Sequence, residues 1–459
     1  MASTGLIGLG SEAVTGTSTG LSQETLDKLR AADDAVIIDP IDRNIEGAAA
    51  RSEAFGLISE KVTAFSSTVE SLNDEMLFLQ RSAYVSEEGI NLSIDKGVSP
   101  QTITVETLQL AKQDIVQSDG FSSLTETVAS EDTTMSITVG GIEYSFDLTS
   151  STTMTDLKDL INDSSAPVTA KVLKTGDSEY RLTITSNDTG DDSEIIVSEE
   201  GLSTNFSAEE NHIQKGVDSE FLFNGTPITR NSNSITDLVV GIELELTQVN
   251  ENPIEITIEP DTNSIMLQVQ SFVDAYNELS VLIEEMTKFD QEGDETGAFQ
   301  GDNNITAITQ TIKRKLLSMD SENRSLIEFG ISLNNVGSLE FDSETFLEKF
   351  NEDPENIENF FLGQDVEDRG ITTHEDGVFY DLNQIMEMYT NSDGILNNIS
   401  NNITTEQDRL NDEREKNIAM LDGRYARMAE QFIQADTLIA QWNQQFNSIQ
   451  MMIDMESSK

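Results

Sequence analysis

The side chains that could do chemistry in this chain are almost all carboxylates. Its 459 residues include 84 Asp and Glu but only two His and no Cys. Without Cys the chain can form neither disulfides nor thiolate metal sites. His212 and His374 lie far apart in the sequence, so a shared transition-metal site is not expected. Carboxylate pairs are so frequent here that no single pair indicates general acid–base catalysis.

One acidic loop deserves comparison with calcium-binding sites. Asp290, Glu292 and Asp294 alternate as calcium ligands can, but the loop lacks the Gly and the distal Glu of an EF-hand. A solvated loop is the preferred interpretation. The chain also contains no G-x-S-x-G, P-loop, H-E-x-x-H or dinucleotide-binding fingerprint. We therefore expect no enzyme activity, no metal and no cofactor.

The net charge limits the possible partners. With 27 Lys and Arg the formal charge is −57, which disfavours nucleic acid and an anionic membrane surface as partners. No stretch approaches the about 20 continuous apolar residues of a membrane span. The start of the chain lacks the basic and apolar regions of a cleaved signal peptide. We expect a cytosolic protein, or one exported without such a signal.

The C-terminal stretch carries the clearest candidate surface. Apolar residues recur there in alternating steps of four and three, as on one face of a coiled-coil helix. Between Gln431 and Ile453 the only charged residue is Asp436. A nearly uncharged helix in so acidic a chain suggests a surface that meets other protein, and packing on the same chain is the alternative. The candidate interface residues are Leu421, Tyr425, Met428, Phe432, Ile439, Trp442, Phe446, Ile449 and Ile453.

Other helices are expected toward both ends of the chain. Residues 1–20 are rich in Gly, Ser and Thr and should be mobile in a free monomer. A short helix should follow Ser22, and Pro40 should interrupt it. The heptad rhythm then appears from Phe55 to Met76 and again from Ile265 to Met286.

The middle of the chain is typical of β structure. Alternating runs flank Gly140-Gly141 and Asn224-Gly225, which predicts two hairpins. A phase slip between Val105 and Leu108 predicts a bulge. We expect the runs around 221–223, 244–246 and 254–258 to pair with residues 101–112, which places one β domain inside another.

The expected fold class is α+β multidomain. A discontinuous helical-bundle or coiled-coil leg domain from both termini should flank two nested β-rich head domains. The expected parts are a mobile N-terminal segment (1–44), a helical leg (45–95 plus 263–395), an inner β-rich head (96–115 plus 213–262), an outer acidic α+β head (116–212) and a C-terminal coiled-coil segment (396–459).

Several segments, in order, resemble the flagellar filament cap family, also called hook-associated protein 2. Residues 20–46 are similar to the N-terminal region of some members, and 142–190 to the outer domain, notably TDLKDLIND and YRLTITSNDTG. Residues 223–246 resemble the most recognisable signature, an Asn-Gly turn followed by Arg230, Asn233, Asp237 and Gly241. Residues 272–287, 327–342 and 424–453 resemble the leg helix, a hairpin and the terminal helix. Two departures are Val336-Gly337, where Asp-Gly is usual, and the stretch before Gly20.

The resemblance implies a cap at the distal tip of the bacterial flagellar filament. It implies a homo-oligomeric ring, expected to be a pentamer, that promotes the folding and insertion of exported flagellin without catalysis. The partners would be flagellin and the flagellar type III export chaperone and apparatus, with secretion through the flagellar channel. The alternative is a surface adhesin that binds host glycan or mucin through the outer head domain.

Overall fold

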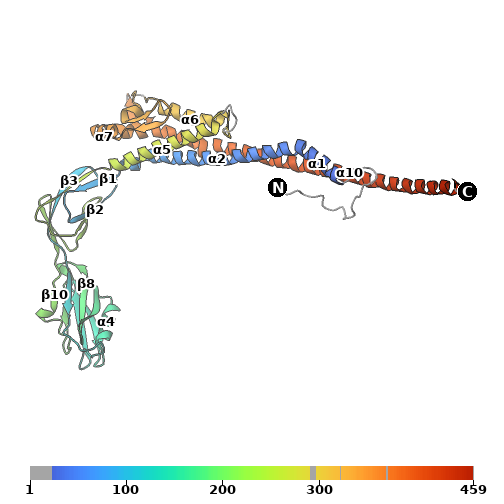
Figure 1. The fold of residues 1–459 in the computed structure, drawn as a ribbon. Coiled ribbons are helices and arrows are strands. Elements are labelled where there is room, and N and C mark those ends of the chain that lie inside the picture. The colour runs from blue at the N-terminus through green and yellow to red at the C-terminus, as the bar shows by residue number, and fades with distance from the viewer. Residues whose placement is uncertain (1–22, 290–295, 321, 369–370, 458–459) are drawn as a thin grey trace. The chain divides into compact units, whose positions relative to one another are not determined.

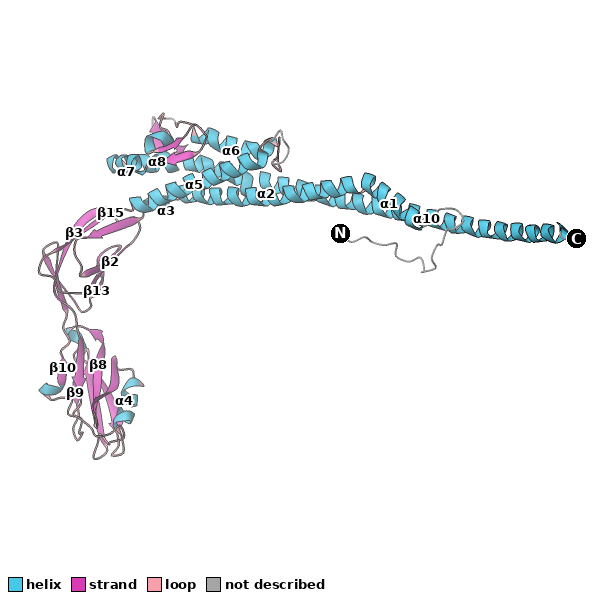
Figure 2. Ribbon diagram, viewed as in Figure 1, coloured by secondary structure: helices cyan, strands magenta, loops and turns pink. Residues whose placement is uncertain are grey.

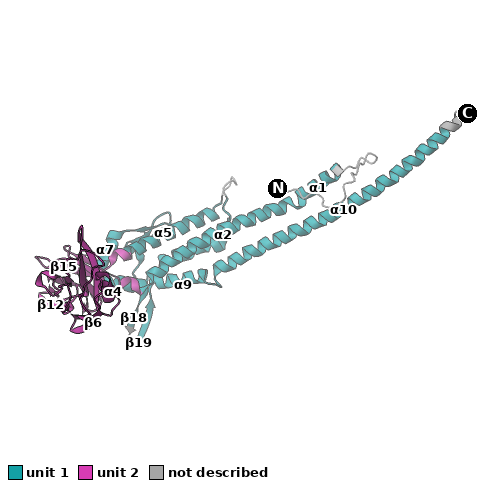
Figure 3. Cartoon of the chain, turned by 90° about the horizontal axis from the view of Figure 1, so that it is seen from below, with its two compact units in different colours: residues 1–74, 266–459 teal, residues 75–265 magenta. Residues whose placement is uncertain are grey.

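The computed structural model describes residues 23–289, 296–320, 322–368 and 371–457 (Figure 1). The chain divides into two compact units, coloured separately in Figure 3. Unit 1 comprises Met1–Asp74 and Met266–Lys459, and unit 2 is the intervening Glu75–Ile265. Helices dominate unit 1 and strands dominate unit 2 (Figure 2). The α+β multidomain class predicted from the sequence is confirmed.

Unit 1 is built from long and short helices with two β-hairpins. Its helices are α1 (Gln23–Ile37), α2 (Asp39–Leu72), α5 (Thr262–Thr287), which begins just before the unit boundary, α6 (Asn303–Leu316), α7 (Ser343–Glu352), α8 (Pro354–Leu362), α9 (Val378–Thr390) and α10 (Ile395–Ser457). The hairpins are β16 (Ile331–Leu333) with β17 (Leu339–Phe341), and β18 (Gly363–Asp368) with β19 (Ile371–Asp376). The hairpin β18–β19 was not predicted, because its strands carry almost no apolar alternation.

The predicted heptad of α2 supplies much of the core of unit 1. Phe55, Ile58, Val62, Phe65, Val69 and Leu72 are all buried. Phe65 lies 5.3 Å from Phe272 of α5, and Phe272 lies 5.1 Å from Phe379 of α9, measured between ring centroids. Pro40 lies in the first turn of α2, where its missing N–H costs no helical hydrogen bond. It therefore marks the break between α1 and α2, as predicted.

Two expected parts of the helical region differ from the structure. Residues 23–44, assigned to a mobile segment, are helical, and Leu26 and Ile38 are buried against α10. Residues 1–20 lie outside the described residues. The C-terminal segment (396–459) was expected apart from the leg, but α10, which begins at Ile395, contacts α2, α9 and α1 within unit 1.

The inner part of unit 2 holds a five-stranded and a three-stranded antiparallel sheet. The strand orders are β1-β15-β3-β11-β12 and β13-β14-β2. The strands are β1 (Arg81–Val85), β2 (Ile90–Ile94), β3 (Gln101–Gln109), β11 (Ser219–Phe223), β12 (Thr226–Arg230), β13 (Ser234–Val239), β14 (Ile242–Leu246) and β15 (Ile254–Pro260), with the short helix α3 (Glu75–Phe78) before them. The turn between β11 and β12 places Asn224 and Gly225 at φ of 48° and 76°, which confirms the predicted hairpin.

Two strand assignments made from the sequence are wrong. β1 and β2 were placed in the helical leg, but they pair with β15 and β14. β1 is an edge strand whose side chains are mostly exposed, so it shows no apolar alternation. The run 244–246 pairs with β2 and β13 rather than with residues 101–112. The bulge is confirmed, because the register of β3 against β11 shifts at Leu108. Leu108 is exposed, whereas Thr107 before it is buried.

The outer part of unit 2 (113–214, hereafter the outer region) has two further antiparallel sheets around one core. The orders are β10-β4-β8-β7 and β6-β5-β9. The elements are β4 (Gln113–Gln117), β5 (Thr133–Val139), β6 (Ile142–Leu148), α4 (Met154–Asn162), β7 (Val168–Gly176), β8 (Glu179–Thr189), β9 (Ile196–Ser198) and β10 (His212–Gln214). Side chains from both sheets and from α4 form a single buried cluster. Gly140 and Gly141 take positive φ between β5 and β6, which confirms the second predicted hairpin.

Candidate assembly surface on the C-terminal helix

The first half of α10 is held by α1 and α2 in an antiparallel arrangement. Arg414 donates to Asp42 at 2.5 Å and Arg51 donates to Glu406 at 3.3 Å. Further along, Arg30 pairs with Asp422, and Arg424 donates to Asp33 at 3.0 Å. As residue numbers fall in α1 and α2, their partners on α10 move toward the C-terminus.

A small apolar cluster closes the contact between α1 and α10. Leu26, Ile38, Leu421, Tyr425 and Ala429 are buried in it. The Tyr425 hydroxyl donates to the Asp33 carboxylate at 2.7 Å. Burial raises the pKa of Tyr425, and the neighbouring Asp33 carboxylate adds to the rise. The first part of the predicted apolar seam, the heptad row of candidate interface residues from Leu421 to Ile453, is therefore packed within the chain.

The remainder of α10 has no apolar cover from the described residues. Trp442 is 68% exposed and Phe446 66%, and Ile449 and Ile453 are 52% and 53% exposed. We call these four side chains the open face. They follow Leu421, Tyr425, Met428 and Phe432 by 21 residues each, which is three heptads. The open face thus repeats the pattern that α1 covers in the first half.

The predicted interface residues fall into three groups. Leu421 and Tyr425 are buried against α1, so the chain itself covers them. Met428 and Phe432 pack partly on the same cluster, and Ile439 is half-buried. Only Trp442, Phe446, Ile449 and Ile453 are largely exposed. The predicted packing on the same chain therefore applies from Leu421 to Phe432, whereas an interface with other chains stays a prediction for the rest of the helix.

Further apolar side chains widen the exposed surface beyond the seam. Ile433, Leu438, Met451 and Met452 are between 44% and 61% exposed. They lie off the heptad positions, so a search for one seam overlooks them. The signal that could have found them is the near absence of charge around the whole helix from Gln431 onward. The C-terminal part of α10 is consequently apolar on more than one side.

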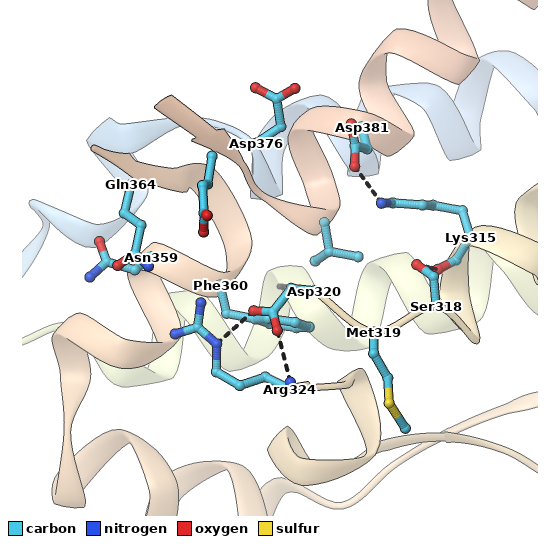
Figure 4. A pocket seen from close by; sticks show the side chains of 12 residues that line it. Lys315, Ser318, Met319, Asp320, Arg324, Asn359, Phe360, Gln364, Asp376 and Asp381 are labelled. Atoms are coloured by element: carbon cyan, nitrogen blue, oxygen red, sulfur yellow. Dashed lines mark hydrogen bonds and ion pairs between the residues drawn. The ribbon is translucent and has the colours of Figure 1, made fainter. Parts of the chain in front are cut away.

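A polar pocket of about 330 Å³ in unit 1 offers little chemistry (Figure 4). Its two cations are already neutralised, since Lys315 of α6 pairs with Asp381 of α9, and Arg324 donates to Asp320 at 2.6 Å. The Arg324 guanidinium also lies 5.6 Å from the ring centre of Phe360 of α8. Ser318 donates to a backbone carbonyl at 2.7 Å, so no base activates it. These contacts tie α6, α8 and α9 together.

Neither histidine lies in a group of metal ligands. His212 Nε2 is 2.9 Å from Asp114 Oδ2, and His374 Nδ1 is 2.8 Å from Asp365 Oδ1. Among the described residues, His, Asp and Glu side chains nowhere gather in threes as metal ligands do. The acidic loop 290–294 lies outside the described residues. Within the ranges that the structure covers, no helix has the length and apolarity to cross a membrane.

Two family models match the two parts of the sequence that flank the outer region. Residues 19–114 match the model of the flagellar hook-associated protein 2 N-terminus, and residues 216–444 match that of its C-terminus. The chain belongs to the flagellar hook-associated protein 2 family. The two matches together include both ends of unit 2 and most of α10.

This chain matches a different share of the length of each relative in the hook-associated protein 2 family. It is 30% identical to the Campylobacter jejuni protein over 78% of this chain and 64% of that protein. It is 32% identical to a Helicobacter pylori protein but spans only 37% of it. The Escherichia coli protein is 25% identical over 93% of this chain and 95% of that one.

The fold is also found in a solved structure. The flagellar cap protein FliD D1-D2-D3 domains from Escherichia coli superpose with a TM-score of 0.57 at 22% identity. The match covers 76% of this chain and 99% of that structure.

Proposed function

We propose that this protein caps the flagellar filament. In this proposal several copies form a ring at the distal tip of the filament, and the ring promotes the folding and insertion of exported flagellin without catalysis. Membership of the hook-associated protein 2 family supports the role. The observation that carries the proposal is the open face of α10, an apolar helix surface for which the described residues provide no partner.

The energetics of the open face favour assembly through several contacts at once. Full burial of a large apolar side chain from full exposure is worth about 1.5–3 kcal/mol, so four give at most about 6–12 kcal/mol. Association costs about 4–15 kcal/mol in lost motion. One pairwise contact is therefore marginal, whereas a ring that forms several contacts together is stable. This suits a surface that must assemble outside the cell and not during export.

The proposed partners follow from the same role. They are other copies of this chain, in a ring expected to be a pentamer, together with flagellin below the ring and the flagellar type III export chaperone and apparatus. The binding energy of incoming flagellin would shift the ring between arrangements of similar energy. No nucleotide is needed in such a cycle.

The mass of the particle in solution tests the proposal. We compare the full chain with a variant that ends at Glu430 and with the double variant Trp442→Ala/Phe446→Ala. The full chain should form a ring, and both variants should remain monomeric with unchanged strand content by circular dichroism. Leu108→Ala, which changes an exposed apolar residue in unit 2, is the control and should form rings. Rings of normal mass from the truncated chain would contradict the proposal.

The adhesin alternative has one candidate location in unit 2. A pocket of about 240 Å³ is lined in part by Tyr144, Asp188, Asp192 and Asn231. Carboxylates, an amide and an aromatic ring are groups that can hold the hydroxyls and the apolar face of a sugar. A glycan array probed with the full chain and with Tyr144→Ala would test this. Absence of binding by the full chain would end the alternative.

A further inference from the structure

One sheet of the outer region presents two neighbouring rows of outward side chains that include no carboxylate. Strand pairing sets Ile115 opposite Thr185 and Thr185 opposite Thr169. The next row sets Gln117 opposite Thr183 and Thr183 opposite Lys171. The residues that alternate with them, Val116, Ile184 and Ala170, are buried. We call the six outward residues the threonine face; they are Ile115, Gln117, Thr169, Lys171, Thr183 and Thr185.

This neutral-to-basic surface is unusual in its setting. Residues 116–212 contain 19 Asp and Glu against four Lys and Arg. Lys171 is exposed, and among the described residues no carboxylate pairs with it. Arg181 borders the face opposite Leu173, and it is joined to Glu179 at 3.0 Å. The Glu179 carboxylate, on the outward side of β8, is thus already engaged by Arg181.

The other sheet of the outer region presents an acidic surface. Asp147 lies opposite Thr134, and Glu143 lies opposite Thr138, which in turn lies opposite Ile196. We call these five residues the acidic face. Glu143 and Asp147 are exposed, whereas Met135, Ile137 and Phe146, which alternate with the outward residues, are buried in the core shared by both sheets. The two faces therefore point away from one core and cannot meet within one molecule.

We propose that the threonine face of one copy contacts the acidic face of the next copy in the ring. Neighbouring outer regions carry the same large negative charge and should repel over most of their surfaces. A close approach is favourable only where one side lacks carboxylates and offers Lys171 toward Glu143 and Asp147. Because the two surfaces differ and lie on different sheets, the contact is head-to-tail, and repetition of such a contact gives a ring when the rotation between copies closes. This inference rests on the proposed ring and adds a second contact to that made by α10.

A more ordinary explanation of Lys171 can be separated from this one. β7 is an edge strand, and lysines on edges prevent unwanted strand pairing. That role accounts for Lys171 and Lys174 on β7 but not for the uncharged rows of β4 and β8. It also predicts that Lys171→Glu would be harmless, since either charge protects an edge.

Cross-linking between copies tests the proposal directly, because the natural chain has no Cys. Lys171→Cys and Asp147→Cys variants of the full chain are purified separately, mixed, assembled and treated with a short bismaleimide. A cross-linked dimer should form in the mixture and not with either variant alone. Lys158→Cys, on α4 and outside both faces, replaces Lys171→Cys in the control mixture and should give no dimer. Rings of normal mass without the mixed cross-link would overturn the inference and leave the cap function standing, whereas absence of rings in the natural chain would instead contradict the cap function.

Charge reversal supplies the second measurement. Lys171→Glu should weaken ring formation about tenfold or more, because like charges would then face each other across the contact. Lys158→Glu makes the same change in net charge elsewhere and should have little effect. Equal effects of the two changes would assign the loss to total charge and contradict a specific contact.

Discussion

Leu421 and Trp442 occupy the same heptad position of α10, three heptads apart, yet only one is covered. Leu421 is fully buried beneath α1, and Trp442 is 68% exposed. Their side chains are equally apolar, so the difference comes from the partner and not from the residue. A substitution at Leu421 should therefore weaken the packing of the free molecule, whereas one at Trp442 should weaken assembly.

The Leu421→Ala substitution should destabilise the contact between α1 and α10. Loss of a fully buried Leu costs about 2–5 kcal/mol, because a cavity remains. Hydrogen exchange of the α1 amides should accelerate in Leu421→Ala and remain unchanged in Trp442→Ala. Unchanged exchange in Leu421→Ala would show that the α1 contact contributes nothing to the free molecule.

Asp156 offers a pH test of the outer region. Thr153 Oγ1 donates to Asp156 and the Thr153 N–H donates to the same carboxylate, and both hydrogen bonds lower the pKa of Asp156. The folded pKa is thus below the unfolded value of about 3.9. The stabilisation is complete above that value and is lost as the pH falls through the lower, folded pKa.

A carbon-detected NMR titration can check the Asp156 assignment. The midpoint for Asp156 in the natural chain should lie below about 3.9. Thr153→Ala removes the hydroxyl and should move the midpoint up toward that ordinary value. Identical midpoints in the two proteins would contradict the capping interaction.

At the scale of elements, α10 must stay helical beyond the part that α1 covers, because the open face forms only on a helix. Isolated helices are marginal in water, and no packed helix of the described residues supports this end of α10. Gln441→Pro should break the helix beside Trp442 at a cost of about 3 kcal/mol, and Gln441→Ala should preserve it. Helical circular dichroism and particle mass should fall together in the Pro variant only; rings from that variant would show that the helix beyond residue 441 is dispensable.

The elements also show which features the sequence could reveal. Phe55 to Leu72 and Ile265 to Ile283 bury one continuous face, so their heptads predicted real helices. Asn224-Gly225 and Gly140-Gly141 predicted hairpins because those turns require positive φ. β1, β18 and β19 were not predicted, because an edge strand or an isolated hairpin need not show alternating apolar residues in its sequence. The sequence also did not predict that packing within the chain ends near Phe432, because the position of α1 sets how much of α10 is covered.

At the scale of the whole molecule, the charge of −57 should govern assembly. Copies in a ring repel one another through this charge, and salt screens the repulsion beyond about 8 Å at physiological ionic strength. Sedimentation should therefore show tighter rings as salt rises from about 0.05 to 0.5 M, although the local attraction at Lys171 weakens. Dissociation of the rings by added salt would mean that specific ion pairs outweigh the net repulsion.

The measurement that tests the central claim most directly is the fluorescence of Trp442, the only Trp of the chain. Its emission should be followed with particle mass across a dilution series. We predict red-shifted emission, open to quenching by iodide, in the monomer, and a blue shift with protection from iodide as rings form. Emission that is already blue and protected at the highest dilution, or that stays red when rings are complete, would contradict the claim that the open face of α10 is covered by other chains.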